Sequence, residues 1–240
     1  MLSSLIASAS GVRGSLPSLH QPAVSEVMLR ASLLLLLVYS MFRASASLRS
    51  IVRVSRYSQQ HAVYGGGPVR GDRLPRLLEI IETQDRGLQT NRQAEIKEII
   101  DSIAQQNADF VARGKQMFSK VDGRWRLVYT TEKETLFFAR SGLFGSKCSG
   151  IYQCIDTEAK SINNLIEFEG GKSFSVLGQI EQSKDASCRV NFRFTKAAIR
   201  LPFEISVPPV GAGWFDNVYM NDKYRLSRDS RGDYLVSIRS

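Results

Sequence analysis

Residues 207–236 read VPPVGAGWFDNVYMNDKYRLSRDSRGDYLV, and this stretch is the most informative part of the chain. Its opening prolines and glycines predict a bend. Three short runs rich in Tyr, Val, Leu and Ile follow, separated by Asn, Asp, Ser and Gly, which favour turns. The runs cover residues 217–220, 223–228 and 233–238. They predict a tight antiparallel meander of three strands.

The middle strand of this meander has two different faces. Successive side chains of a strand point to opposite sides, so Tyr224 and Leu226 share one face. Lys223, Arg225 and Ser227 share the other face. The pattern predicts a sheet with one dry face and one wet face. On this interpretation, Tyr224 and Leu226 point inward.

Further strands are predicted upstream of the meander. Apolar side chains alternate along residues 125–129 and along residues 190–194. Other candidate strands cover residues 150–155, 162–168 and 174–180. The total is about eight short strands with turns between them, which favours an antiparallel up-and-down β-barrel. A closed sheet of about eight strands leaves room for one small ligand.

Two helices are predicted ahead of the strands. Leu and Ile recur at helical spacing over residues 74–83 and 91–104. Their polar faces carry acids, whereas helices that lie on membranes favour Lys and Arg. We therefore expect the helices to pack on the barrel, as a lid or plug over one end. The folded part then divides into helices at 74–118 and a barrel at 123–240.

Residues 207–236 resemble the C-terminal signature of the plastid lipid-associated proteins, the plant and algal fibrillins. In that family a PPVGxGWFDxVY turn precedes an RxxRDxxGDYLV hairpin, and here the residues are VPPVGAGWFDNVY and RLSRDSRGDYLV. A second match is GRWRLVYTTEKE at residues 123–134, where the family shows GxWxLxYT. The resemblance runs from about residue 74 to the end. It implies a lipocalin-like barrel associated with plastid membranes or lipid bodies.

The GxW at residues 123–125 also resembles the first strand of lipocalins. There the Trp closes one end of the barrel under an Arg from the last strands, and an aromatic ring attracts such a cation. Arg225 and Arg228 are the candidate partners of Trp125. We assign structural roles, rather than ligand chemistry, to Trp125, Trp214, Asp216, Arg225, Arg228 and Asp229.

A ligand inside the barrel would contact the inward alternates of the strands. The candidate ligand-binding residues are Tyr129, Val190, Phe192, Phe194, Tyr224 and Leu226. The same side chains could instead fill the barrel completely, and the sequence leaves both alternatives open.

The first part of the chain has the composition of a targeting leader. Residues 1–58 contain fourteen Ser and a single acid, Glu26, which predicts an organellar transit peptide. The family resemblance implies that the organelle is the plastid. The apolar run at residues 31–42 leaves a bipartite leader or a membrane anchor as alternatives, although it is shorter than the about 20 residues of a membrane span. A linker at 59–71 then precedes the family domain at 72–240.

Composition argues against several functional classes. Residues 1–71 carry seven Arg and one acid, and the remaining 25 Lys and Arg face 22 acids. A domain so close to neutral argues against a nucleic-acid partner. The histidines, His20 and His61, both precede the domain, so we expect no catalysis, no metal and no cofactor. The three cysteines are either free thiols or include a bridge between Cys148 and Cys154.

The resemblance implies a non-catalytic protein that binds or shelters an apolar plastid lipid, such as a prenylquinone, a carotenoid or an acyl lipid. Its expected location is the plastoglobule or thylakoid surface. The first alternative is a purely structural plastoglobule coat or adaptor with a filled barrel. The second is an auxiliary factor or enzyme of quinone or lipid metabolism.

Overall fold

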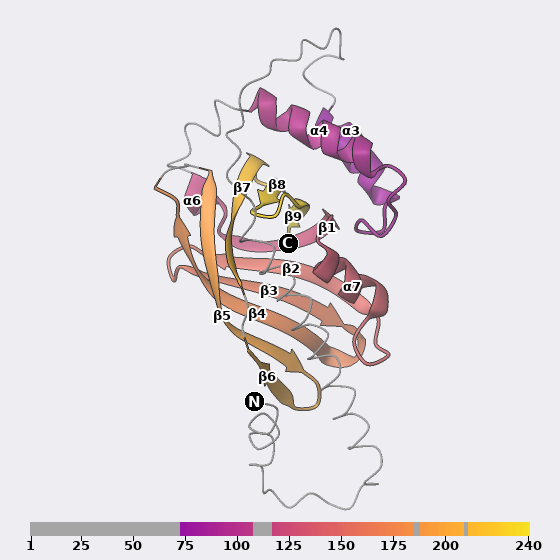
Figure 1. Ribbon diagram of the computed structural model, residues 1–240, viewed down its shortest axis with the longest axis vertical. Coiled ribbons are helices and arrows are strands. Elements are labelled where there is room, and N and C mark those ends of the chain that lie inside the picture. Colours follow the sequence, from indigo (N-terminus) through magenta and orange to yellow (C-terminus); the bar gives the residue numbers. More distant parts are fainter. Residues whose placement is uncertain (1–72, 108–116, 185–187, 209–210) are drawn as a thin grey trace, which may run out of the picture. The chain divides into compact units, whose positions relative to one another are not determined.

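The computed structural model describes residues 73–107, 117–184, 188–208 and 211–240 (Figure 1). The leader predicted at 1–58 and the linker at 59–71 lie outside the described residues. The same holds for residues 108–116 of the predicted helical segment.

The helices come mainly before and just after the first strand. The described helices are α3 (Arg73–Glu82), α4 (Gln93–Gln106), α6 (Met117–Lys120), α7 (Lys133–Ser141) and the 3-10 turn η3 (Glu169–Gly171). The sequence analysis predicted α3 and α4 but missed α7. No helix in the described ranges combines the length and the apolar character needed to cross a membrane.

The strands form one antiparallel sheet. They are β1 (Gly123–Thr130), β2 (Cys148–Asp156), β3 (Ser161–Phe168), β4 (Lys172–Gln182), β5 (Arg189–Arg200), β6 (Glu204–Val207), β7 (Ala212–Met220), β8 (Tyr224–Asp229) and β9 (Tyr234–Arg239). Their order is β4-β3-β2-β1-β9-β8-β7-β5-β6, and β4 also pairs with β5.

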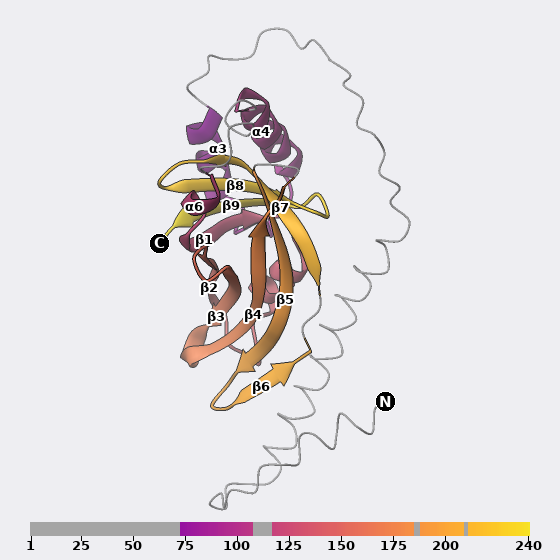
Figure 2. The same ribbon diagram turned by 90° about the vertical axis from the view of Figure 1, so that its left-hand side faces the viewer.

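This last pairing closes the sheet into a ring. Ten residue pairs join β4 to β5, from Ser173↔Arg200 to Gln182↔Val190. The first half of β5 pairs with β7 on its other side, and the second half pairs with β6. Among the described strands, eight therefore complete the ring and β6 extends from it as a hairpin with β5 (Figure 2). The mainly β, barrel-like fold with about eight strands is confirmed.

The helices α3 and α4 cover the outer face of part of the ring. Their buried Leu and Ile side chains pack with Tyr129, Leu226, Tyr234 and Val236 of strands β1, β8 and β9. Figure 2 shows both helices alongside β8 and β9. The prediction that these helices close one end of the barrel is therefore wrong. They instead provide a second apolar core on the outside of the sheet.

One end of the ring is closed by Trp125. Its side chain is fully buried, and its indole Nε1 donates a hydrogen bond to the backbone oxygen of Val121, 2.8 Å away. The guanidinium of Arg239 lies 4.2 Å from the centre of the Trp125 ring. It also donates hydrogen bonds to the backbone oxygens of Lys120, Asp122 and Asp222. Arg239 therefore ties the last strand to the segment that precedes β1.

Candidate functional site

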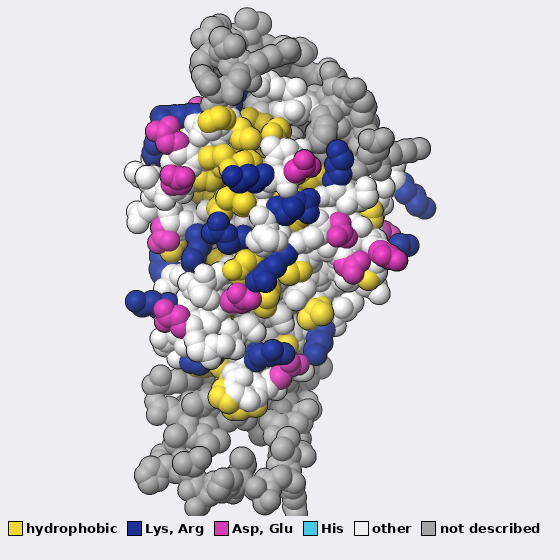
Figure 3. Space-filling view, turned by 180° about the vertical axis from the view of Figure 1, so that it is seen from behind, with side chains coloured by type: hydrophobic (Ala, Val, Ile, Leu, Met, Phe, Trp, Pro, Cys, Tyr) yellow, Lys and Arg dark blue, Asp and Glu magenta, His cyan; other side chains and the backbone are white. Residues whose placement is uncertain are grey.

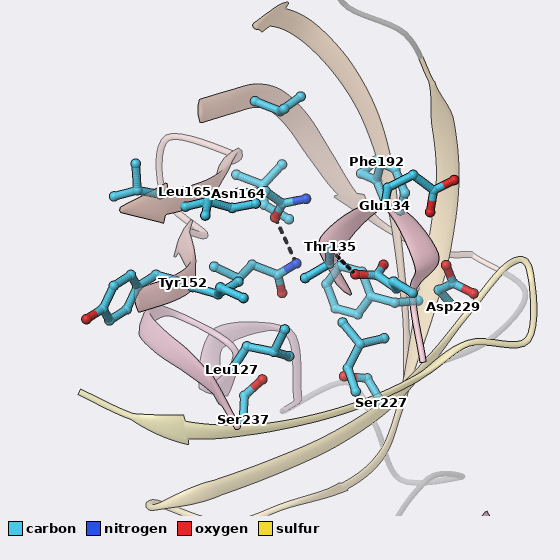
Figure 4. Close-up of a pocket in the computed structure, with 18 of the residues that line it drawn as sticks. Leu127, Glu134, Thr135, Tyr152, Asn164, Leu165, Phe192, Ser227, Asp229 and Ser237 are labelled. Carbon is cyan, nitrogen blue, oxygen red and sulfur yellow. Dashed lines mark hydrogen bonds between the residues drawn. The ribbon is translucent and has the colours of Figure 1, made fainter. Parts of the chain in front are cut away.

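The interior of the ring contains a cavity of about 160 Å³. Its walls are mostly apolar and include Leu127, Ile151, Ile162, Val176, Phe192 and Phe215. A polar group formed by Gln153, Asn164, Ser227 and Ser237 interrupts these walls. Figure 4 shows Leu127, Ser227 and Ser237 pointing toward the amide of Asn164 across the cavity. The ring is therefore not completely filled, and its interior offers hydrogen bonds as well as apolar surface.

The alternation of the strands decides which side chains reach the cavity. In β8, Arg225, Ser227 and Asp229 line the cavity, whereas Leu226 is buried against α3 and α4. The inward and outward faces of β8 expected from the sequence are thus exchanged, and neither face is wet. The physical reason is that helices cover the outside of β8, so both faces of this strand lie away from water.

Tyr129 changes face because β1 contains an irregularity. The pairing of β1 with β9 shifts register between Leu127 and Tyr129, as happens at a β-bulge. Leu127 therefore lines the cavity, and Tyr129 points outward into the cluster with the helices. Burial there raises the pKa of Tyr129 to about 12.

The structure places the candidate ligand-binding residues in three different environments. Phe192 and Phe194 line the cavity, with their ring centres 4.9 Å apart. Val190 is buried beside Trp125 and Phe215 at the closed end of the ring. Tyr129 and Leu226 face the helices, and Tyr224 is half-buried outside the cavity lining. The inward placement of Tyr129, Tyr224 and Leu226 is therefore wrong.

Several lining residues were missed by the sequence analysis. Gln153 and Asn164 are neighbours on β2 and β3, and the Gln153 amide donates a 3.0 Å hydrogen bond to the Asn164 side chain. Ser227 and Ser237 lie on β8 and β9. Polar side chains at these positions look like solvent-facing residues in a sequence. To identify them, one must know which face of each strand points into the ring. For β8, this is the face opposite the one that the helices cover.

Arg225 forms part of the cavity wall and has an unusual environment for a charged residue. Its side chain is 1% exposed, and its guanidinium lies 5.0 Å from the Trp125 ring centre and 5.5 Å from that of Phe215. One nitrogen donates a hydrogen bond to the Gln153 side chain. Burial, together with the charge of Arg239, lowers the pKa of Arg225 to about 9, so the group remains a cation at neutral pH.

The opposite end of the cavity is bordered by α7 and the β8–β9 turn. Glu132, Glu134, Thr135 and Phe138 line the cavity there. Phe138 also stacks on Phe174 of β4, with ring centres 5.0 Å apart. We call this end the mouth. The helix α7, rather than α3 or α4, is thus the element that covers an end of the ring.

A single arginine holds the mouth together. Arg231 lies within 2.8–3.4 Å of carboxylate oxygens of Glu132, Glu134, Asp229 and Asp233. The pKa of Glu132 is raised to about 7, mainly by burial. The positive charge of Arg231 opposes this rise, and the negative charges of Asp229 and Asp233 add to it. Burial also raises the pKa of Asp233. The mouth therefore has more acids than its one arginine can neutralise.

The residues assigned structural roles have mixed positions. Arg225 lies near Trp125, as described above, but Arg228 does not. Its guanidinium instead pairs with Asp101 of α4 and lies 4.9 Å from the Tyr234 ring centre. Arg228 thus joins α4 to the outside of the sheet. The arginine closest to Trp125 is Arg239, which the sequence analysis did not consider.

Trp214 and Asp216 belong to one surface arrangement on β7. The Arg189 guanidinium lies 3.6 Å from the Trp214 ring centre and donates two hydrogen bonds to Asp216, at 2.8 and 2.9 Å. Trp214 is half-buried, whereas the adjacent Phe215 is 4% exposed. From the sequence, a large aromatic that follows Gly213 and precedes three strands is expected to be packed under the barrel, and for Trp214 this expectation is wrong, because the alternation of β7 turns Phe215 inward instead.

The three cysteines are free thiols. Cys188 is buried, and Cys148 and Cys154 are partly buried. Burial raises the pKa of all three thiols, which lowers the thiolate fraction at neutral pH. In the described ranges, no group of three or more His, Cys, Asp or Glu side chains is arranged to hold a metal ion.

Comparison with known proteins identifies relatives of this chain. The chain is 38% identical over 165 residues to "Probable plastid-lipid-associated protein 11, chloroplastic" of Arabidopsis thaliana, covering 67% of this chain and 76% of the relative. It is 27% identical over 131 residues to "Probable plastid-lipid-associated protein 12, chloroplastic" of the same plant, covering 48% of this chain but only 32% of that protein. No solved structure matches significantly. The PAP_fibrillin family model matches residues 73–238, and the chain therefore belongs to the PAP/fibrillin family.

Proposed function

We propose that this protein is a non-catalytic lipid-binding protein of plastids that takes up or shelters an apolar lipid in the ring. Prenylquinones, carotenoids and acyl lipids are the candidate classes. The observation that carries the proposal is the cavity of about 160 Å³ with apolar walls and a few hydrogen-bonding groups, which is typical of small-molecule sites. The two relatives named as chloroplastic plastid-lipid-associated proteins support both the lipid and the plastid.

The mouth and an exposed apolar hairpin lie at the same end of the ring. The tip of the β5–β6 hairpin carries Phe203, which is 48% exposed. The hairpin leaves the sheet where Arg200 pairs with Ser173, next to Phe174, which contacts α7 at the mouth. Figure 3 shows hydrophobic side chains with Lys and Arg beside them at the lower end of the described surface. We propose that this end docks on plastoglobules or thylakoids, where a lipid could pass directly into the mouth.

Lipid uptake should depend on the width of the mouth. Thr135 lines the cavity from α7, so Thr135→Trp should obstruct the mouth and weaken the binding of a fluorescent lipid analogue at least tenfold. Lys133→Trp is the matched control, because Lys133 is exposed on the same helix. Titration of the full chain measures both. The absence of saturable uptake by the parent protein would contradict lipid carriage and favour the structural coat.

Docking on a lipid surface should depend on Phe203. Burying a Phe side chain is worth about 1.5–3 kcal/mol, and roughly half of Phe203 is exposed, so Phe203→Ser should weaken vesicle binding about fivefold. Co-sedimentation with vesicles measures this effect. Ser149→Ala, an exposed change on β2, is the control. Equal sedimentation of parent and Phe203→Ser would exclude the hairpin tip as the contact.

A further inference from the structure

Arg225 is a buried cation without a counter-ion. Within the described part of the chain, no carboxylate lies within ion-pair distance of its guanidinium, and neither Nε nor Nη1 has a hydrogen-bond acceptor. Taking a charge out of water is costly unless it is paired and hydrogen-bonded. The rings of Trp125 and Phe215 offset part of this cost. They accept no conventional hydrogen bond, so these two buried nitrogens have no acceptor among the described residues.

The position of Arg225 directs it toward a ligand. The residue lines the cavity, and its remaining nitrogen contacts Gln153, which lines the cavity as well. Gln153 is itself fixed by Asn164. The polar wall is thus a connected set of side chains that ends at a cation. An anionic group placed there would supply the missing counter-ion.

The size of the cavity limits how much of a ligand it encloses. A cavity of about 150 Å³ in another protein holds a molecule of the size of benzene. The present volume of about 160 Å³ therefore suits a head group with a short stretch of chain, not a complete long-chain lipid. The rest of the ligand must leave through the mouth, where Phe192 and Phe194 offer apolar contacts.

The charges at the two ends decide the direction of the ligand. Four carboxylates surround Arg231 at the mouth, so an anion held there would meet a negative environment. At the other end, Arg225 and Arg239 are both positive. An anionic head group is therefore favoured deep in the ring, with an uncharged chain passing the acids.

We propose that the cavity binds an amphipathic lipid with a carboxylate head group, which Arg225 holds, while the hydrocarbon chain leaves through the mouth beside α7. This proposal rests on the proposed function and narrows its ligand class to free fatty acids and related lipid carboxylates. Arg225 thereby gains a binding role in addition to the structural role beside Trp125 that the sequence indicates.

Oleic acid and methyl oleate test the proposal, because they differ only in the charge and size of the head group. In calorimetric titrations of the full chain, we expect methyl oleate to bind at least tenfold more weakly, which corresponds to about 1.4 kcal/mol. Arg225→Met should weaken oleate binding about tenfold and leave methyl oleate binding unchanged. Arg225→Lys retains the charge and should retain a preference for oleate.

Two controls separate binding from folding. Arg124 stacks on Tyr152 and is exposed, so Arg124→Met should leave the preference for oleate unchanged. Thermal unfolding of each variant shows whether it is folded. If Arg225→Met does not fold, the ratio of the two affinities in the parent protein still decides whether the carboxylate is recognised.

Four results would overturn the proposal, and only the last of them would also overturn the proposed function. Equal binding of oleate and methyl oleate by the parent protein would exclude recognition of the carboxylate, although the protein would still take up lipid. Tighter binding of an uncharged short-chain quinone than of oleate would indicate that the polar side chains of the cavity bind a neutral carbonyl group instead of a carboxylate. A preference for oleate that persists in Arg225→Met would exclude Arg225. If the parent binds none of these probes, the proposed function fails together with this inference.

Discussion

Trp125→Ala should lower the free energy of unfolding by about 3–5 kcal/mol, the usual cost of removing a large aromatic side chain from a core. Trp125 is fully buried at the closed end of the ring. The substitution also removes its hydrogen bond to Val121 and its contacts with Arg225 and Arg239. Chemical denaturation followed by circular dichroism measures the change.

Trp214→Ala is the matched control for this prediction. Trp214 is half-buried on the outside of β7, so its removal should cost about 1 kcal/mol, mostly through the lost contact with Arg189. Equal losses in the two variants would contradict the assignment of Trp125 to the core and Trp214 to the surface.

The fold could be predicted from the sequence because its strands carry local signals. Turn residues on both sides of β8 and before β9, together with the alternation in β1 and β5, indicate where these strands lie. The spacing of Leu and Ile predicts the helices α3 and α4. By contrast, β6 has four residues and α7 has nine, so neither is long enough to show a distinct period of apolar residues.

The candidate site was harder to predict because it depends on which face of each strand points inward. Alternation alone separates Leu226 from Arg225 but does not say which side is inside. Because α3 and α4 cover the outer face of β8, the apolar Leu226 lies outside and the polar Arg225 and Ser227 lie inside. The bulge beside Leu127 then reverses the phase for Tyr129. Such tertiary information has no local signal in the sequence.

Arg231→Met should lower the free energy of unfolding at pH 8 by about 3 kcal/mol, because it leaves partly buried carboxylates without their cation. Losing Arg231 raises the carboxyl pKa values of the folded state. The folded variant then binds more protons than the unfolded chain, so its stability falls as the pH rises. The deficit should therefore be large at pH 8 and small near pH 4. A deficit that does not depend on pH would contradict this electrostatic role.

Glu132→Gln should have the opposite effect, although it removes one partner of Arg231. The pKa of Glu132 is about 7 in the folded protein against an ordinary value of 4.5, so ionisation of this carboxyl opposes folding above neutral pH. One pKa unit corresponds to about 1.4 kcal/mol. Because the side chain remains 21% exposed, we expect a gain of only about 1–2 kcal/mol at pH 8.

The pH dependence of Glu132→Gln decides whether this account is right. Between about pH 4.5 and 7 the folded parent holds a proton that the unfolded chain has released, so the parent loses stability as the pH rises through this window. The variant lacks this loss, and its advantage should vanish below about pH 4.5. Glu134→Gln removes a carboxylate 2.8 Å from the same arginine and should bring no gain. If Glu132→Gln is less stable than the parent at pH 8, the contact with Arg231 outweighs the cost of burying the carboxylate, and the mouth is held by favourable ion pairs alone.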